Sequence, residues 1–414
     1  MASSFLVPLS VALLCLALSG WASSAAARQC NIFVDGRNGD DQRHNGTSWR
    51  TPFQTMGAAA FLISNRTLFP HPTAVVCVAP GVYKDQKLHL VLSNENQTLR
   101  HLTIRGLHGS DCTASSRRPL EVCPVILYLQ VIIGSKEPPP PLDKLPHLLS
   151  VNIHNLWVET FLYNVMPPIG WSMPARVSAW DLVLRELDMR DLLGPVVQME
   201  RILVSPRPFV ELLGVKSYPP KVLISSGTQN YSAAIVWRSS VMEGYQNDLF
   251  DEFQLFTLAS VTVENSLFAQ GKFLTLHVEA DLTIRNTTFR RFDKVPYAGD
   301  LVCLADSTSI TLQDLSFIEN RLSGSLIDSW AKRATIEGCY FDHNVSPSGE
   351  PALPPLRQRY NATVFTVGRG NRFNERYDPP FRCPTDNKVS PFGLFGCEDC
   401  PSGLKPNHNR TACV

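Results

Sequence analysis

Short stretches in which apolar and polar residues alternate recur along the chain. Apolar residues at the first and third positions predict a strand with one buried face, because successive side chains of a strand point to opposite sides. A turn-forming or acidic residue stands fifth, and a large apolar residue stands eighth. Five segments share this pattern: LVLRELDM from Leu182, VTVENSLF from Val261, LTIRNTTF from Leu282, ITLQDLSF from Ile310 and ATIEGCYF from Ala334.

The fifth position of each segment predicts a sharp bend. In the four clearest copies it is Asn265, Asn286, Asp314 or Gly338, and these residue types accept a left-handed backbone most readily. After the bend, a second short strand is expected to return a phenylalanine to the interior. The four phenylalanines are Phe268, Phe289, Phe317 and Phe341.

The spacing of the copies indicates a solenoid. Looser copies begin at Leu102, Val151 and Ala234, and the copies from Ala234 onward start 27, 21, 28 and 24 residues apart. A period of about 25 residues with variable insertions is typical of stacked coils. An antiparallel sandwich also has short alternating strands, but it does not explain a bend residue that is followed three places later by phenylalanine. We therefore predict an all-β parallel β-helix with a column of phenylalanines inside it.

The opening of the chain resembles that of the pectin lyase-like right-handed parallel β-helix superfamily. The resemblance is carried by IFVDGRNGDDQRHNGTSWRTPFQTMGAAAFL from Ile32 and by VVCVAPGVY from Val75, and it extends from Cys30 to Phe373. It implies a first strand, a Gly/Asp turn and a short capping helix, for which Thr55 is a suitable N-cap. The segments FIEN from Phe317 and FDHN from Phe341 are similar to the FxxN repeats of polymorphic outer-membrane-type β-helix adhesins.

The two ends of the chain differ in composition from its body. An apolar run from Phe5 to Leu18, followed by small residues up to Ala27, predicts a cleavable secretory signal, although no Lys or Arg precedes the run. A single N-terminal membrane anchor is the alternative. We expect a signal peptide over 1–27, a β-helix domain over 28–376 with proline-rich loop insertions around 138–220, and a cysteine-rich module over 377–414.

The cysteines predict a disulfide framework. Cleavage of the signal would leave ten of them, and an even number fits full pairing in a secreted protein. The candidates are Cys30, Cys77, Cys112, Cys123, Cys303, Cys339, Cys383, Cys397, Cys400 and Cys413. The tail CEDCPSGLKPNHNRTACV resembles EGF-like or tumour-necrosis-factor-receptor-like modules, and for it we favour disulfides over a zinc site.

Sequons for N-linked glycosylation support an extracellular or cell-surface location. The candidate asparagines are Asn45, Asn65, Asn96, Asn230, Asn344, Asn361 and Asn409. Asn286 also heads a sequon, but it is a predicted bend residue, and packing at the bend would prevent its modification.

The charge pattern excludes several partners. The formal net charge is +1 and no basic run occurs, so nucleic acid is not expected as a partner. After the signal, no apolar stretch has the length of a membrane helix, so membrane contact is expected only through a part that this chain does not contain.

The sequence offers candidate charges but no catalytic motif. A β-helix polysaccharide lyase needs clustered acids for calcium and an Arg or Lys base. The candidates on strands are Asp181, Arg185, Glu186, Asp188, Arg190, Arg285, Arg290 and Arg291. An exposed strand face carries such charges by default. Asp40 and Asp41 lie in a turn that Asn38 and Gly39 explain, and the spacing of DGRNGDD does not match a calcium loop.

We therefore assign no catalytic, cofactor or metal residues from the sequence, and calcium stays the single cofactor candidate. The favoured hypothesis is a secreted or cell-surface glycoprotein that binds a glycan or another protein without catalysis. The first alternative is a polysaccharide lyase of the pectate lyase kind or a related carbohydrate-active enzyme. The second is the ectodomain of a receptor-like surface protein.

Overall fold

The computed structural model describes residues 30–65, 67–84, 86–92, 99–107, 124–135, 150–166, 176–190, 196–204, 221–225, 234–243, 252–257, 260–271, 274–278, 280–293, 302–305, 309–329, 331–345, 355–358, 364–374, 381–383, 388–394 and 397–414. The predicted signal peptide lies outside these residues. The same holds for Cys112, Cys123, Asn96, Asn230 and Asn361 and for most of the proline-rich insertions. Among the described residues, no helix has the length and apolar character needed to cross a membrane.

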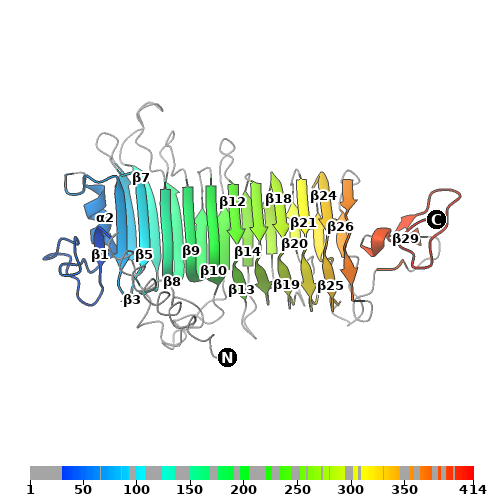
Figure 1. Ribbon diagram of the computed structural model, residues 1–414, viewed down its shortest axis with the longest axis horizontal. Helices are drawn as coiled ribbons and strands as arrows, with labels where there is room; N and C mark the ends of the chain where they lie inside the picture. The colour runs from blue at the N-terminus through cyan, green and yellow to red at the C-terminus, as the bar shows by residue number, and fades with distance from the viewer. Residues whose placement is uncertain are drawn as a thin grey trace, which may run out of the picture.

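The chain winds into a long stack of coils, which confirms the predicted parallel β-helix (Figure 1). Strands β1 to β28 pair in parallel, and each coil contributes to up to three faces. Two long strands, β8 (Ser150–Met166) and β9 (Arg176–Arg190), each run through all three faces. Strand β10 (Val196–Val204) runs through the first two.

The first face is built from the strands that open each coil. Besides the first parts of β8, β9 and β10, it contains β1 (Ile32–Val34), β2 (Thr73–Val78), β5 (His101–Gly106), β12 (Ala234–Arg238), β15 (Ser260–Glu264), β18 (Asp281–Arg285), β21 (Ser309–Gln313), β24 (Arg333–Glu337) and β27 (Val364–Val367).

The second face follows a tight bend. Its further strands are β3 (Gly81–Tyr83), β6 (Pro124–Ile126), β13 (Val241–Glu243), β16 (Leu267–Ala269), β19 (Thr288–Arg290), β22 (Ser316–Ile318), β25 (Tyr340–Asp342) and β28 (Arg372–Phe373). In the five coils that begin with β12, β15, β18, β21 and β24, two residues separate the first face from the second.

The third face closes each coil. Its further strands are β4 (Gln86–Leu92), β7 (Leu129–Ser135), β11 (Lys221–Ser225), β14 (Glu252–Thr257), β17 (Leu274–Val278), β20 (Val302–Ala305), β23 (Ile327–Ser329) and β26 (Leu356–Gln358). The sequence pattern predicts only two strands per unit, so this third face is an addition to the predicted coil. The chain segments that connect the third face to its neighbours vary in length from coil to coil.

Left-handed residues form the bends. The predicted bend residues Asn265, Asn286, Asp314 and Gly338 have φ of 51°, 44°, 52° and 65°, which confirms the prediction. A second left-handed column lies at the end of the second face, at Gln270, Arg291, Glu319 and His343. Gln, Arg and Glu are not typical left-handed formers, and His343 alone belongs to an enriched type, so the second bend has no common residue signal in the sequence.

The predicted phenylalanine column runs through the interior. Phe268, Phe289, Phe317, Phe341 and Phe373 stack with centroid separations of 5.4, 5.2, 5.5 and 5.0 Å and nearly parallel rings. The rings of Phe289, Phe317 and Phe341 are fully buried. The column exists because parallel pairing in register places equivalent side chains directly above one another.

A buried asparagine ladder stands beside the phenylalanine column. Nδ2 of Asn320 donates to Oδ1 of Asn344 at 2.7 Å and to the carbonyl oxygen of Phe289 at 3.1 Å. Nδ2 of Asn344 donates to the carbonyl oxygen of Phe317 at 2.9 Å. Oδ1 of Asn320 also accepts from Phe292 N–H at 3.1 Å, so the ladder hydrogen-bonds backbone groups beside the second bend.

The burial of Asn344 corrects one glycosylation assignment. Its side chain is fully buried and its amide nitrogen belongs to the ladder, so a glycan has no space there. At Asn286 the amide nitrogen donates to Oδ1 of Asn265 at 2.7 Å, although the side chain is exposed. Asn45 and Asn409 are exposed and Asn65 is half-buried.

The two ends of the stack are covered differently. Helix α2 (Met56–Ser64) covers the first end with Met56, Ala59, Ala60 and Ile63, and Oγ1 of Thr55 caps it by accepting from Ala58 N–H at 3.2 Å. The second end meets the tail, which contains β29 (Lys388–Val389), the 3₁₀ turn η2 (Pro391–Gly393) and β30 (Glu398–Asp399). Leu394 of this tail joins the main core.

Three disulfides are formed among the described cysteines, at Cys30–Cys77, Cys383–Cys397 and Cys400–Cys413. The expectation that every cysteine is paired is wrong at Cys339, which is a free, buried thiol. Burial raises the pKa of this thiol to about 12, so it stays protonated at neutral pH. The side chain of Cys303 on β20 lies outside the described residues.

The repeat alignment is wrong for one of its five best segments. Residue Leu182 pairs with Leu156 and Ile202 and therefore opens the second face, whereas Val261 lies on the first face. The first-face equivalent of Val261 in this coil is Val177. The segment from Leu182 imitates a first-face strand because all faces of the coil alternate in the same way.

The phenylalanine column generates a stability prediction. Phe317→Ala is expected to lower the free energy of unfolding by about 3–5 kcal/mol, because it leaves a cavity between two stacked rings. Phe61→Ala is the matched control, since Phe61 of α2 is 69% exposed, and it should change stability by no more than about 0.5 kcal/mol. Chemical unfolding monitored by circular dichroism measures both. Equal effects would contradict the column's role.

The ladder generates a prediction on glycosylation. Protein secreted from a eukaryotic host is expected to carry glycans at Asn45, Asn65 and Asn409 and none at Asn344, because only the buried amide is inaccessible. Glycopeptide mass spectrometry measures the occupancy of each site, and Asn45→Gln should remove one glycan. A glycan at Asn344 on folded protein would contradict the ladder.

Candidate ligand-binding face

The acids and bases singled out on β9 do not share one position in the coil. The residue-by-residue pairing of β8 with β9 passes over Asp181, which lies at the first bend, and Arg185, which lies at the second. Glu186, Asp188 and Arg190 lie on the third face. Their side chains lie outside the described residues. The backbone register alone thus distributes these charges over two bends and one face of a single coil.

The other candidate bases have acidic partners at two different bends. Arg285 pairs with Glu264 near the first bend. Nε of Arg291 donates to Oε2 of Glu319 at 2.7 Å at the second bend. Arg290 is half-buried at the end of β19. The structure therefore does not gather Arg285 and Arg291 into one basic site.

The aspartates of the opening turn hold the local backbone. Oδ1 of Asp41 accepts from the N–H groups of Gln54 and Thr55, at 2.7 and 3.0 Å, and Oδ1 of Asp40 accepts from Gln42 N–H at 2.9 Å. Backbone hydrogen bonds from Gln42 and Arg43 lower the pKa of Asp40. Asp40 and Asp41 thus serve as turn anchors, as the turn chemistry predicted.

Asp35 belongs to the same turn. Burial alone would raise its pKa, but hydrogen bonds from the Asn38 side chain and from the N–H groups of Arg37 and Asn38 outweigh burial and lower it. No group of three or more His, Cys, Asp or Glu side chains suited to a metal ion occurs among the described residues. The turn therefore gives no support for the calcium candidate.

A regular line of polar side chains lies on the outer surface of the first face. Thr262 pairs in register with Thr283, Thr283 with Thr311, Thr311 with Thr335, and Thr335 with Thr366. Their neighbours in each strand, such as Val261 and Val263, are buried inside the coil. These five threonines therefore point outward and form a line across five coils, which we name the threonine row.

The threonine row is solvent-accessible along its length. Thr262, Thr283, Thr311 and Thr335 are half-buried by their neighbours, and Thr366 at the end is exposed. In the other direction the same column continues through Val236 to Gln198, Ser178, Asn152 and Thr103. The column is therefore polar over most of the stack.

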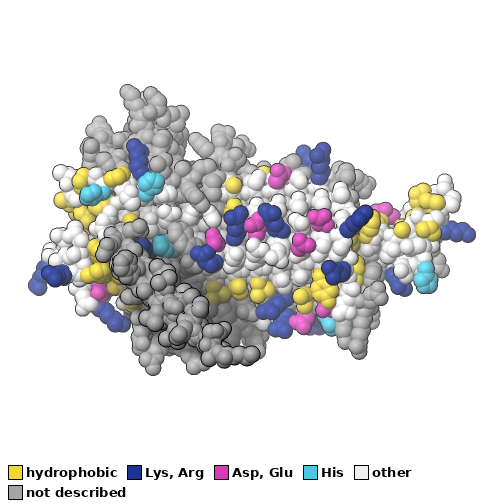
Figure 2. Space-filling model, in the orientation of Figure 1, with side chains coloured by type: hydrophobic (Ala, Val, Ile, Leu, Met, Phe, Trp, Pro, Cys, Tyr) yellow, Lys and Arg dark blue, Asp and Glu magenta, His cyan; other side chains and the backbone are white. Residues whose placement is uncertain are grey.

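A charged row flanks the threonine row on the side of the first bend. Its members, also in register, are Arg238, Glu264, Arg285, Gln313 and Glu337. On the other side, the equivalent positions are Ala234, Ser260, Asp281, Ser309 and Arg333. Basic and acidic side chains are intermixed along the middle of the stack in the space-filling view (Figure 2).

An ion triplet fixes part of the charged row. Nε of Arg238 donates to Oε2 of Glu264 at 2.7 Å, and Nε of Arg285 donates to Oε1 of the same carboxylate at 2.5 Å. The Glu264 side chain is 11% exposed, whereas the two arginines are about half exposed. One carboxylate thus holds two guanidinium groups at the surface in defined positions.

The geometry of this surface suits an elongated, hydroxyl-rich ligand. Neighbouring strands lie about 4.8 Å apart, so the threonine row repeats one hydroxyl at that interval. A hydroxyl both donates and accepts hydrogen bonds, and threonine suits an outward strand position because it is β-branched. The surface is therefore a linear, rigid array of hydrogen-bonding groups flanked by fixed charges.

The sequence contained the signal for this row, but its function was not recognised. In the four correctly aligned segments the second residue is threonine, in VTV, LTI, ITL and ATI. The prediction of the repeat rests only on the inward positions. Core packing does not require the same residue at an outward position. The repeated threonine is therefore the sequence signal for the threonine row.

Comparisons with known proteins identify no family. No protein family profile matches the sequence, and no curated protein matches it. Among solved structures, the selenomethionine derivative of a GH136 lacto-N-biosidase from Eubacterium ramulus is similar with a TM-score of 0.37 and 12% identity, over 85% of this chain and 70% of that chain. The native form gives a TM-score of 0.35 and 10% identity, over 83% and 69%. Similarity at this level indicates neither a family nor an activity.

The ion triplet generates a stability prediction. Glu264→Gln is expected to lower the free energy of unfolding by about 1–3 kcal/mol, because it leaves two adjacent arginines without their shared, largely buried counter-charge. Glu319→Gln is the matched control. Glu319 pairs with one arginine and its side chain is 47% exposed, so its loss should cost under about 1 kcal/mol. Thermal and denaturant unfolding compare the two variants, and equal losses would show that the triplet is not special.

Proposed function

We propose that this protein is an extracellular glycoprotein that binds an extended glycan along its first face without catalysis. The observation that carries the proposal is the threonine row, a line of five outward hydroxyls in register. The inward residues of these strands are explained by core packing, whereas the repeated outward threonine is not.

The spacing of the row favours a polymer over a compact ligand. Four steps of about 4.8 Å place the first and last hydroxyls roughly 19 Å apart. One step is close to the length of one sugar residue in an extended chain. A glycan that lies across the strands would therefore present equivalent hydroxyls to successive coils, and each coil would add a similar increment of affinity.

The charges on both sides of the row favour a neutral or weakly charged glycan. The two flanking columns together contain three basic and three acidic side chains, namely Arg238, Arg285, Arg333, Glu264, Asp281 and Glu337. A strongly acidic polymer would gain little net attraction from such a surface. Specificity would come from hydrogen-bond geometry and from the positions that the ion triplet fixes.

The lyase alternative requires several acids and a base that converge on one groove. On the first face, Glu264 is held between Arg238 and Arg285, so its carboxylate is already occupied. This arrangement supports binding rather than proton abstraction.

The location of the protein is part of the proposal. Disulfides persist in oxidising compartments, and the three observed pairs fit a secreted or cell-surface protein. The sequon asparagines Asn45, Asn65 and Asn409 stand where glycans have room. We also propose that the short tail with Cys383 to Cys413 is an extracellular module of the EGF-like or receptor-like kind.

Binding to a glycan array tests the proposal. The double variant Thr311→Val/Thr335→Val removes two hydroxyls and keeps the β-branched shape, so we expect at least a tenfold loss of affinity, about 1.4 kcal/mol, for any glycan that the wild type binds. Ser316→Ala is the matched control, since Ser316 is half-buried and its neighbour Phe317 fills the core of the second face.

Titration calorimetry at low and high salt completes this test. The expected affinity changes little with salt, because the face is balanced in charge. Unchanged binding by the threonine variant, or loss of binding only in the serine control, would contradict the assignment of the first face. An unsaturated, ultraviolet-absorbing product from any acidic polysaccharide would instead favour the lyase.

A further inference from the structure

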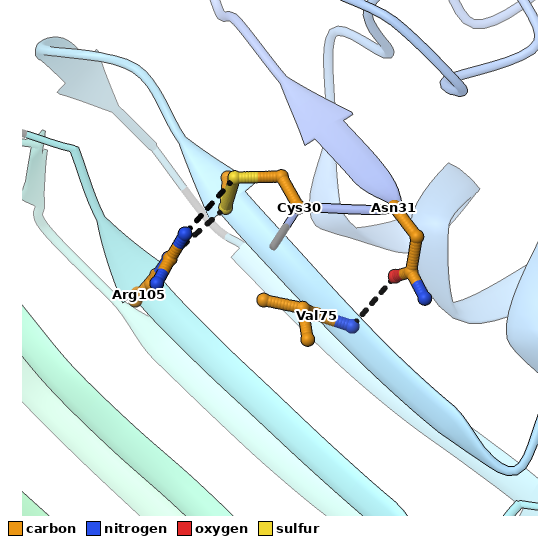
Figure 3. The surroundings of a disulfide bond; sticks show 5 residues. Cys30, Asn31, Val75 and Arg105 are labelled. Atoms are coloured by element: carbon orange, nitrogen blue, oxygen red, sulfur yellow. Dashed lines mark hydrogen bonds between the residues drawn. A yellow bond between two sulfur atoms is a disulfide. The ribbon is translucent and has the colours of Figure 1, made fainter. Parts of the chain in front are cut away.

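The disulfide nearest the first end of the stack has an unusual neighbour. Cys30 precedes β1 and joins Cys77 of β2, with Cα atoms 5.8 Å apart. The register places Arg105 of β5 beside Cys77. Figure 3 shows the Arg105 guanidinium directed at the two sulfur atoms.

The guanidinium contacts both sulfurs. Nε of Arg105 donates to Sγ of Cys77 at 3.2 Å, and Nη2 donates to Sγ of Cys30 at 3.3 Å. A neutral sulfur is a weak acceptor, so these contacts add little while the disulfide is closed. When the bond breaks, a thiolate forms, and the same contact becomes a charge-assisted hydrogen bond. Arg105 therefore stabilises the reduced pair more than the oxidised pair.

The two cysteine residues also differ in exposure. Cys77 is fully buried, whereas Cys30 is half-buried. A nucleophile from solvent therefore reaches Cys30, and Cys77 becomes the leaving group. Exchange is faster when the leaving thiol has a lower pKa, and a neighbouring arginine lowers it.

We propose that Cys30–Cys77 is a thiol-exchange site at which a small extracellular thiol attaches to Cys30. The thiol first loses its proton to solvent. Its thiolate then attacks Sγ of Cys30, the new S–S bond forms, and the Cys30–Cys77 bond breaks. The electron pair goes to Sγ of Cys77, which becomes a thiolate that accepts from Arg105.

A second molecule of the thiol completes the reduction. It attacks the outer sulfur of the mixed disulfide, Cys30 leaves as a thiolate, and the two small thiols end as one disulfide. Overall, Cys30 and Cys77 gain two electrons and the small thiol loses them.

The fold tolerates this reaction, because the first strand has other attachments. Nδ2 of Asn31 donates to the carbonyl oxygen of Thr73, and Oδ1 of Asn31 accepts from Val75 N–H, both at 2.7 Å. Residues Ile32–Val34 also pair with Val76–Val78. Opening the disulfide therefore releases Cys30 and leaves the first strand paired with β2. Cys30 becomes a covalent attachment point on a folded protein.

Exchange kinetics test this site on the full secreted chain. The protein is incubated with reduced glutathione, quenched with acid and alkylated, and peptide mass spectrometry then gives the open fraction of each disulfide. Cys383–Cys397 and Cys400–Cys413 are internal references. We expect Arg105→Gln to slow the opening of Cys30–Cys77 about tenfold, because the leaving thiolate loses its counter-charge. The two tail pairs should keep their rates.

Two further variants make the result decisive. Arg105→Lys retains a charge without the fork geometry, so an intermediate rate is expected. Arg43→Gln is the control, because the Arg43 side chain is 86% exposed, and it should have no effect. If a thermal scan shows that Arg105→Gln loosens the first coils, the comparison rests on Arg105→Lys.

The expected adduct is glutathione on Cys30. Opening of Cys30–Cys77 at the wild-type rate in Arg105→Lys and Arg105→Gln would overturn the proposal, and so would an adduct found only on Cys77. A lack of glycan binding would leave it untouched, since the two sites have no residue in common.

Discussion

Parallel pairing in register is the constraint on which the rest of this structure depends. Each coil must place its residues directly above their equivalents in the coil before it, because the ladder hydrogen bonds leave no freedom to slip by one residue without exposing the core. Inside the stack, this constraint produces the phenylalanine column and the asparagine ladder. Outside, it produces the threonine row and the charged row. A single repeated geometry thus accounts for both the stability and the candidate site.

Much of this architecture could be predicted from the sequence, and the reasons for success are local. The first bend is predicted by the backbone preferences of its residues, which are Asn265, Asn286, Asp314 and Gly338. A phenylalanine follows each of them three residues later. Thr55 predicts the N-terminus of α2, because threonine is a favoured N-cap residue. Each signal uses a residue whose chemistry is specific for its conformation.

The parts that were missed lack such residues. The second bend is formed by Gln270, Arg291, Glu319 and His343, of which only His343 belongs to a residue type that favours a left-handed backbone. Because no residue signal marks the second bend, the sequence does not show where the second face ends and the third begins. For the same reason, the segment from Leu182 was assigned to the wrong face. The contact of Arg105 with the Cys30–Cys77 disulfide joins β5, β2 and the residue Cys30 before β1, so no local sequence pattern reveals it.

In the five coils that begin with β12, β15, β18, β21 and β24, the corner between the first and second faces has a constant length of two residues, while the chain between the other faces varies in length. Because two residues turn the chain in each of these coils, the distance from the side-chain rows of the first face to those of the second stays the same across all five. Where the connections vary, residues can be gained or lost during evolution without moving those rows. In this part of the stack, new loops can therefore be acquired at the other two corners while the side-chain rows of the first and second faces keep their spacing.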